Sequence, residues 1–190
     1  MNSIKNMPDF CRVKEISRFI IGKEILNLGG SEGYMQEYIK NKNPDKIVYT
    51  HDFSGQDFNF DLNGKWPIKK KFNTIIAGEV IEHLDNARLF LLECMNHLLP
   101  DGRLILTTPN ATGLNYIMNP EWCVNYKEYE GHCHAFTLPM LEKLLRQSGF
   151  SVIHKDYINA FWKRNPLKII SHIFKRLRPD IIIVGEIKNE

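Results

Sequence analysis

The stretch that decides the fold is Ile25–Gly33, ILNLGGSEG, in which a short apolar run ends in adjacent glycines. The apolar run predicts a buried strand, and the glycines predict a tight turn before a helix over residues 31–41. Glycine lets a backbone approach a ligand closely, and a helix N-terminus offers free N–H groups to that ligand. Gly29, Gly30 and Gly33 are therefore candidate ligand-binding residues. The spacing is not GxGxxG, which disfavours a dinucleotide site.

Apolar strands alternate with helices along the rest of the chain. Strands are predicted over residues 46–52, 72–80, 103–110, 151–158 and 180–187, and helices over residues 10–20, 86–100, 138–148 and 166–177. Such alternation predicts a mostly parallel α/β sheet covered by helices on both faces. Ligands of these sheets bind beyond the carboxyl ends of the strands, so the informative residues should directly follow strands.

Length and composition favour one compact domain over residues 1–190. The chain has 190 residues, 43% of them hydrophobic, and 25 basic against 22 acidic side chains give a net charge of +3. This apolar share excludes global disorder, and the charge is too small to imply nucleic acid. No apolar run approaches the roughly 20 residues that span a bilayer, and the first residues do not resemble a secretory signal. We therefore expect a soluble, cytoplasmic monomer or homodimer that binds no nucleic acid.

The cysteines show no CxxC spacing, and we expect them to be reduced. A zinc site was considered because two of them lie close to histidines. Neighbouring residues such as Cys133 and His134 point in different directions, and no second pair is present to complete a zinc site. We therefore predict no metal and an ordinary loop. The cysteines are Cys11, Cys94, Cys123 and Cys133, and the residues weighed as zinc ligands are Cys123, His132, Cys133 and His134.

Asp52 closes the second strand about twenty residues after the glycine turn. An acid at this place can accept hydrogen bonds from both ribose hydroxyls of a nucleoside. The alternative is a turn-forming aspartate, which is common at strand ends. We favour the ribose role because the spacing matches the glycine turn.

Three further segments carry a resemblance to a known family. They are FNTIIAGEVIEHL (72–84), LLPDGRLILTTPN (98–110) and GHCHAFTLPMLEKLLRQSGF (131–150). In this order and spacing they resemble the class I S-adenosylmethionine-dependent methyltransferases, over roughly Glu24 to Phe150. Within that family the chain is similar to the ubiquinone-biosynthesis O-methyltransferases and to methyltransferases of polysaccharide pathways. The resemblance implies a three-layer Rossmann-like sandwich whose last strand is antiparallel, and S-adenosylmethionine as cofactor.

The resemblance also implies roles for single residues. The glycine turn would wrap the methionine moiety, Asp52 would hold the ribose, and Phe53 would pack on the adenine. Asp61 and Leu62 would face the amino edge of the adenine. Residues at the end of the next strand would line the sulfonium pocket. The full set of expected cofactor-binding residues is Asn27, Gly29, Gly30, Ser31, Gly33, Asp52, Phe53, Asp61, Leu62, Gly78 and Glu79.

The chain departs from this family at the glycine turn and at one sheet edge. The family usually has an acid where Asn27 stands and a glycine at Ser31. Asn27 can form hydrogen bonds but cannot offset the charge of the cofactor's amino group. Between Asp52 and Asp61 there is too little chain for a helical crossover, which needs about a dozen residues. We therefore expect a sheet that is truncated after its second strand.

Methyl transfer to a hydroxyl benefits from a general base, and histidine suits this role near neutral pH. The candidates are His83, His132 and His134, and each has the alternative of a structural hydrogen bond. Residues 111–137 form a long irregular stretch after a strand end, which is typical of an acceptor-binding lid. Its aromatic residues would stack on a sugar or aromatic acceptor, or would simply anchor the stretch to the core. With the N-terminal helical segment, residues 1–22, it would determine the acceptor.

Residues 163–178 contain six basic residues, no acidic residue and an apolar stripe. A basic amphipathic helix of this kind can lie on an anionic membrane surface. More often such a helix covers a sheet and exposes its basic face, and we favour this interpretation.

The main hypothesis is an S-adenosylmethionine-dependent methyltransferase with a small-molecule acceptor. The acceptor would be a hydroxyl of a sugar or lipid-linked glycan intermediate, or of an aromatic metabolite. The alternative is a catalytically silent methyltransferase-like module that binds a partner, which Asn27, Ser31 and the trimmed edge would suit. A nicotinamide-dependent oxidoreductase is disfavoured by the glycine spacing and by EVIEHL, residues 79–84, which has no role in such an enzyme.

Overall fold

The structure is a computed structural model that describes residues 8–30, 33–52, 57–119, 131–160 and 167–188. Its centre is an open sheet of six strands in the order β2-β1-β3-β4-β6-β5. β1 to β4 are parallel, and β6 is antiparallel to both of its neighbours, so the predicted mostly parallel sheet with an antiparallel last strand is confirmed. The strands are β1 Glu24–Leu28, β2 Ile47–His51, β3 Phe72–Gly78, β4 Leu98–Pro109, β5 Phe150–Ile158 and β6 Asp180–Ile187.

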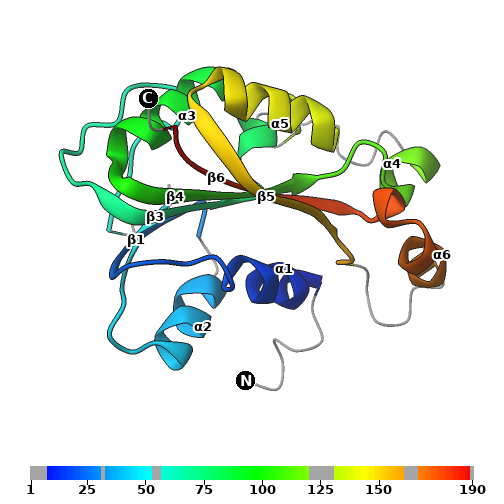
Figure 1. Cartoon of the computed structure of the whole chain (residues 1–190), viewed down its shortest axis with the longest axis horizontal. Helices are drawn as coiled ribbons and strands as arrows, with labels where there is room; N and C mark the ends of the chain where they lie inside the picture. Colours follow the sequence, from blue (N-terminus) through cyan, green and yellow to red (C-terminus); the bar gives the residue numbers. More distant parts are fainter. Residues whose placement is uncertain (1–7, 31–32, 53–56, 120–130, 161–166, 189–190) are drawn as a thin grey trace.

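Helices cover both faces of this sheet (Figure 1). One face carries α1 (Pro8–Ile16) and α2 (Tyr34–Lys42), and the other carries α3 (Ala87–His97) and α5 (Leu138–Gln147). The expected three-layer sandwich is therefore confirmed. Shorter helices lie at the strand ends: η2 (Ile81–His83), α4 (Leu114–Met118), α6 (Leu167–Ile173) and η3 (Lys175–Leu177).

The central strands are apolar throughout because successive side chains enter different cores. In β3, Ile75 and Ala77 pack in the core under α3 and α5, whereas Ile76 packs in the core next to α1. Ile105 of β4 joins the second core in the same way. A strand buried on both faces has no polar alternation, which is why these segments read as continuous apolar runs.

Side chains and glycines fix the helix ends near the predicted places. Asn86 Oδ1 accepts a hydrogen bond from the Leu89 N–H at 2.9 Å, and this caps the start of α3. Thr137 caps α5 by accepting a bond from the Met140 N–H at 3.4 Å. Gly149, with φ of 94°, directly follows Ser148, the C-cap of α5, and turns the chain into β5, as predicted.

The trimmed sheet edge is also present. β2 is an edge strand, and beyond it the described residues add an isolated parallel bridge between His51 and Phe58. The buried His51 ring holds this short segment, because its Nε2 lies 2.7 Å from the Phe60 carbonyl oxygen.

Two elements differ from the predictions. β4 starts at Leu98 instead of residue 103, because the buried Leu98 pairs with Phe72 before the Asp101–Gly102 turn. The stretch 111–137 was predicted to be irregular, but residues 114–118 form α4. A five-residue helix is too short to show helical periodicity in a sequence. In the described part of the chain, no helix is long and apolar enough to cross a membrane.

Candidate functional site

A cavity of about 290 Å³ opens at the carboxyl ends of β1 and β3, on the face that carries α1 and α2. This is the edge at which parallel α/β sheets bind ligands. α1 closes one side, the turn after β1 forms the floor, and the ends of β3 and β4 complete the wall. The polar and glycine residues that line it are Arg12, Asn27, Gly29, Gly30, Gly33, Gly78, Glu79 and Thr107.

The glycines of the turn after β1 serve different purposes. Gly29 has φ of 68°, and a Cβ added there would lie 2.7 Å from Val80 Cγ2. A Cβ on Gly30 would overlap the Asn27 amide, so the turn packs directly on the side chain of β1. Gly33 has φ of 69°, yet apart from its chain neighbours no described residue has an atom within 4 Å of an added Cβ, so this side of Gly33 is open toward the described part of the chain. Gly29 and Gly30 are therefore required by the turn itself, and Gly33 leaves room beside the cavity.

Glu79 lies between β3 and η2 in the left-handed region, with φ of 56°. Such a conformation is rare for a residue with a side chain, costs about 1–3 kcal/mol and tends to occur at functional sites. The Glu79 N–H is held by the Thr107 carbonyl oxygen at 3.0 Å. Its carboxylate forms an ion pair with Arg12 at 2.7 Å, and Arg12 also lies 3.6 Å from Asp180. The strained turn thus places the Glu79 carboxylate beside the Arg12 guanidinium at the cavity.

Arg12 was not predicted as a site residue. It lies on α1, fifteen residues before Asn27, and only the tertiary structure brings it to the glycine turn. Its own sequence neighbourhood has no feature that marks a ligand. The N-terminal segment, which was expected to influence the acceptor, therefore also closes the cofactor side of the cavity.

The cavity contains polar groups that suit a polar ligand. Thr107 is fully buried, and its hydroxyl has no hydrogen-bond partner among the described residues. Asn27 is 4% exposed and lines the same cavity. Buried polar groups nearly always have partners, so an open hydroxyl facing a cavity suits a ligand or water. Together with the cation of Arg12, these groups fit the zwitterionic methionine end of S-adenosylmethionine.

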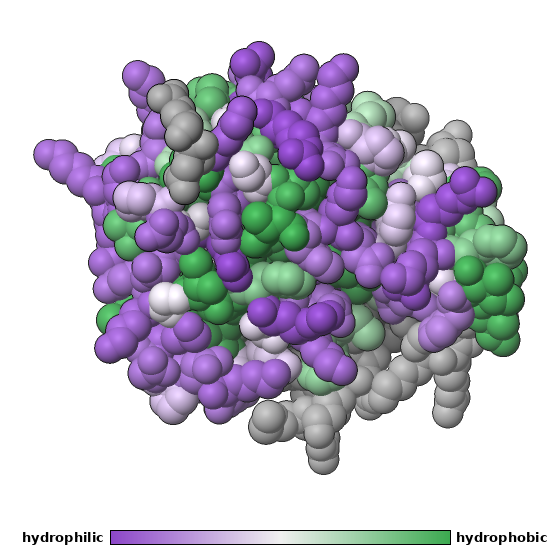
Figure 2. All heavy atoms as spheres, in the orientation of Figure 1, coloured by the Kyte–Doolittle hydropathy of each residue, from purple (hydrophilic) through white to green (hydrophobic). Residues whose placement is uncertain are grey.

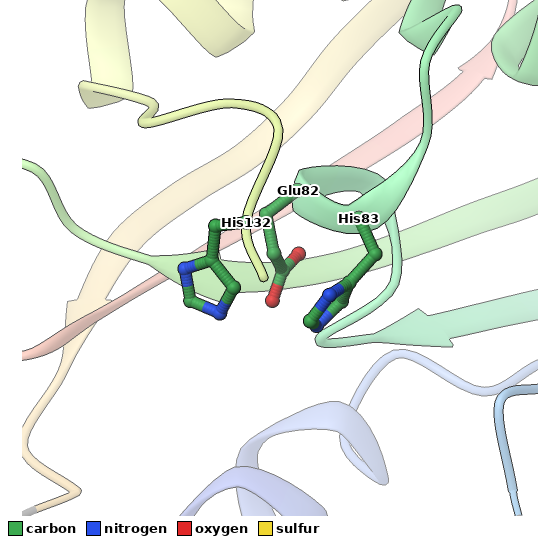
Figure 3. A group of neighbouring side chains, drawn as sticks. All are labelled: Glu82, His83 and His132. Carbon is green, nitrogen blue, oxygen red and sulfur yellow. The ribbon is translucent and has the colours of Figure 1, made fainter. Parts of the chain in front are cut away.

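A second group of side chains lies where β3 leads into η2. Figure 3 shows the Glu82 carboxylate between the rings of His83 and His132, which comes from the chain just before α5. One ligand atom from each of the three lies within 4.8 Å of the others, close enough to hold one cation between them. This is the one such group of three found in the described part of the chain. Neither the spacing of motifs nor the composition had indicated Glu82 as a site residue.

Glu82 is 1% exposed. Its Oε2 accepts a hydrogen bond from Thr108 at 3.0 Å, and its Oε1 has no partner among residues that the structure describes. Burial, followed by the charge of Glu79, raises the pKa of Glu82 well above its usual value. The carboxyl group therefore takes up a proton more readily than a carboxyl group in solvent.

His132 is half-buried, and its Nδ1 lies 3.0 Å from Tyr116 Oη of α4. Its ring meets the His83 ring edge-on, with 4.8 Å between centroids. Burial and then the neighbouring His83 lower the pKa of His132. The neutral ring, which can accept a proton, is therefore favoured at neutral pH.

The main chain of Glu82 holds the segment that carries His132. The Glu82 carbonyl oxygen accepts hydrogen bonds from the N–H groups of Cys133 at 2.7 Å and His134 at 3.0 Å. This clamp brings residues 131–134 against η2, and it explains why residues fifty positions apart share one site. His134 itself lies outside the group of three, and its ring packs on Phe136 at 5.6 Å.

Comparison with known proteins identifies the family. The family model described as a methyltransferase domain matches residues 6–155. The chain belongs to the class I S-adenosylmethionine-dependent methyltransferases. The predicted enzyme class and the predicted cofactor, S-adenosylmethionine, are confirmed with it.

Curated relatives match the sequence of this chain over shorter stretches. The chain is 39% identical over 76 residues to a ubiquinone biosynthesis O-methyltransferase of Rickettsia conorii, which is 38% of this chain and 26% of that protein. It is 40% identical over 47 residues to the mitochondrial ubiquinone biosynthesis O-methyltransferase of Rattus norvegicus, 25% of this chain and 14% of that protein. The chain thus matches about a quarter or less of the length of these relatives.

Solved structures share the fold over nearly the whole chain. One is a putative methyltransferase in complex with the Haloferax volcanii Trm112 methyltransferase activator, with a TM-score of 0.72, 13% identity, and 99% of this chain and 94% of that chain covered. Another is an S-adenosylmethionine-dependent methyltransferase from Mesorhizobium loti, with a TM-score of 0.67, 13% identity, and coverage of 96% and 99%.

In this methyltransferase, the cavity contains six of the predicted cofactor residues: Asn27, Gly29, Gly30, Gly33, Gly78 and Glu79. Asp52 directly follows β2 and is half-buried, and its N–H donates to the Phe58 carbonyl oxygen at 3.2 Å. Asp52, Asp61 and Leu62 are not among the residues that line the cavity. Asp61 is exposed and accepts the Asn63 N–H at 2.8 Å in a turn, and Leu62 is buried in the core under α3. The predictions for Ser31 and Phe53 lie outside the described residues.

The proposed lid is described in part. Tyr116 is 8% exposed, and its hydroxyl lies 3.0 Å from Nδ1 of His132, a residue of the same stretch, so the role of the stretch stays a prediction. The aromatic residues 122, 126 and 129, and Cys123 of the considered zinc site, lie outside the described residues. The described cysteines, Cys11, Cys94 and Cys133, are free thiols, as expected.

Proposed function

We propose that residues 1–190 form one methyltransferase domain that transfers the methyl group of S-adenosylmethionine to a hydroxyl of a small molecule. The acceptor class is a sugar or lipid-linked glycan intermediate, or an aromatic metabolite. The observation that supports a hydroxyl is the His132 ring, which is held by Tyr116 with a lowered pKa beside Glu82. A hydroxyl acceptor must lose a proton, and this ring can take it.

The cofactor supplies a methyl group on a positively charged sulfur. The chain would hold its methionine end in the cavity, where the Arg12 guanidinium would bind the carboxylate and Asn27 would bind the amino group. Gly29 and Gly30 form the turn beneath it, and Asp52 would bind the ribose hydroxyls. Phe53 would pack on the adenine, as the family resemblance implies.

His132 would act as the general base. In the tautomer with a proton on Nδ1, that N–H donates to Tyr116 Oη, and the lone pair of Nε2 is left for the acceptor's proton. The proton taken from the acceptor then rests on Nε2. A positioned base contributes about 100- to 10,000-fold to a rate. Alignment of the acceptor by the protein contributes about 7–11 kcal/mol in addition.

Calorimetry with S-adenosylhomocysteine tests cofactor binding and separates the enzyme from the silent module. The enzyme should bind this product, whereas absence of binding at about millimolar ligand would support the module that Asn27 and the trimmed edge suggested. Binding of NAD instead would refute the assignment altogether.

The acceptor needs a transfer assay. Labelled S-adenosylmethionine is offered with sugar nucleotides, phenols and lipid-linked glycans, each with and without EDTA. We expect transfer to one hydroxyl class that the chelator leaves unchanged. Loss of activity with EDTA, with recovery on adding Mg²⁺, would instead assign Glu82, His83 and His132 to a cation and refute the proton role.

A further inference from the structure

α6 presents an apolar face to solvent. Ile169 is 70% exposed, Ile173 is 71%, Phe174 is 53% and Ile170 is 43%. These residues are three or four positions apart and therefore lie on one side of the helix. Figure 2 shows apolar residues gathered at the edge of the molecule where α6 lies in Figure 1. We call these four residues the α6 patch.

The orientation of α6 is the reverse of that expected for a helix that covers a sheet. Among residues 169–173, whose burial is described, Ser171 is the buried one, and its hydroxyl donates to Asn159 Oδ1 at 3.1 Å. The Asn159 amide donates in turn to His172 Nδ1 at 3.0 Å. Arg178 holds the following turn by donating to the carbonyl oxygens of Tyr157 at 2.9 Å and Ser171 at 3.2 Å. Polar bonds attach α6 to the end of β5 and turn its isoleucines outward, so the sheet-covering interpretation is wrong.

Basic residues predominate around the α6 patch. From residue 163 to residue 178 the sequence has six basic residues and no acidic one. Lys175 and Arg176 directly follow the patch, and both are exposed. Lys175 pairs with Asp156 at 3.2 Å, an ion pair at the surface that solvent weakens. The face is therefore complementary to an apolar surface that carries negative charge.

α4 extends the apolar surface at the same end of the sheet (Figure 1). Ile117 is 60% exposed and Met118 is 65%. The turn before α4 is tied to η3, because Thr112 Oγ1 donates to the Arg176 carbonyl oxygen at 3.0 Å. α4 and the basic residues of η3 therefore belong to one fixed end of the molecule.

We propose that the α6 patch docks on an anionic lipid bilayer. The isoleucines would enter the boundary between head groups and acyl chains, and Lys175 and Arg176 would contact lipid phosphates. The basic run lies beside an exposed apolar helix. This combination suits the many negative charges of an anionic bilayer better than it suits a neutral groove of a protein. This surface goes beyond the proposed chemistry and does not depend on it.

Flotation of the full chain with lipid vesicles tests the proposal. Vesicles of phosphatidylcholine are compared with a 3:1 mixture of phosphatidylcholine and phosphatidylglycerol. We expect binding to the mixture alone, and weaker binding at about 0.5 M salt because salt screens the charges. Each basic residue near an anionic surface contributes about fivefold to partition, so the double variant Lys175→Gln, Arg176→Gln should bind about 25-fold more weakly. The double variant Ile169→Ser, Ile173→Ser should weaken binding to the vesicles by at least the same factor.

The matched control is the double variant Lys40→Gln, Lys42→Gln. It removes the same charge from exposed positions on α2, which lies far from α6 in Figure 1, and should bind like the parent chain. Equal thermal unfolding by circular dichroism would show that each variant is folded. Absence of binding to either vesicle would overturn the proposal, as would equal losses in the control. Dimerisation without lipid that Ile173→Ser abolishes would instead make the α6 patch a contact between two copies.

Discussion

Replacing Arg12 by glutamine should weaken the binding of S-adenosylhomocysteine without unfolding the protein. Arg12 lines the cavity, 21% exposed, with its guanidinium 2.7 Å from Glu79. If it also binds the carboxylate of the ligand, the variant loses one charge-assisted hydrogen bond. Such a bond contributes about 1.5–3 kcal/mol, which corresponds to about a 10- to 150-fold increase in Kd.

Arg103→Gln is the matched control. Arg103 forms an ion pair with Glu186, also at 2.7 Å and with a similar exposure of 27%, but it lies outside the cavity. Partly exposed ion pairs contribute about 1 kcal/mol or less to stability, so both variants should lower the Tm by a similar, small amount. In isothermal titration calorimetry, Arg12→Gln alone should then weaken the binding of S-adenosylhomocysteine.

A truncated ligand distinguishes direct contact from an indirect effect. 5′-Methylthioadenosine keeps the nucleoside and the sulfur but has no carboxylate, so it should bind the parent chain and Arg12→Gln equally well. If Arg12 acted only by holding Glu79 in place, Arg12→Gln would weaken the binding of both ligands by the same factor. Equal losses for the two ligands, or an unchanged Kd for S-adenosylhomocysteine, would refute the assignment of Arg12 to the carboxylate.

Four further outcomes follow from the geometry. His132→Ala should lower kcat about 100- to 10,000-fold and leave the Kd for S-adenosylhomocysteine unchanged, as measured by a transfer assay and calorimetry; an unchanged kcat removes His132 as the base. Because the pKa of His132 is lowered and the neutral ring is the active form, kcat/KM should fall as pH drops through a value below about 6.5. His83→Ala removes a like charge and should move that midpoint upward; a downward shift in the pH–rate profile would contradict the pairing. Gly30→Ala should lower the free energy of unfolding by about 1–3 kcal/mol, because the added methyl overlaps the Asn27 amide, whereas Gly64→Ala, 3.8 Å from its nearest neighbour, should not; equal urea denaturation curves would show that the turn can relax.

Local patterns predicted the architecture well because they reflect local physics. The apolar run before Gly29 predicted β1, since a strand buried on both faces must be apolar throughout. The short chain between Asp52 and Asp61 predicted the trimmed edge, since a crossover has a minimum length. The family resemblance added the cofactor and the order of the sheet.

The same patterns could not predict the acid–base group. No role was predicted for Glu82, since its role depends on its burial and on the hydrogen bonds from the Cys133 and His134 N–H groups to its carbonyl oxygen. The pKa of His132 depends on the nearby His83, forty-nine positions earlier. Environments of this kind exist only after the chain has folded.

The sequence by itself determined the class of fold, the glycine turn and the family, because periodicity and short motifs act over a few neighbouring residues. Only the tertiary structure brought Arg12 to the glycine turn and His132 to Glu82, since those contacts join segments far apart in the chain. It also decided which way α6 faces. An amphipathic sequence specifies that a helix has an apolar side, but the bonds of Ser171 and Arg178 determine whether that side meets the sheet or the solvent.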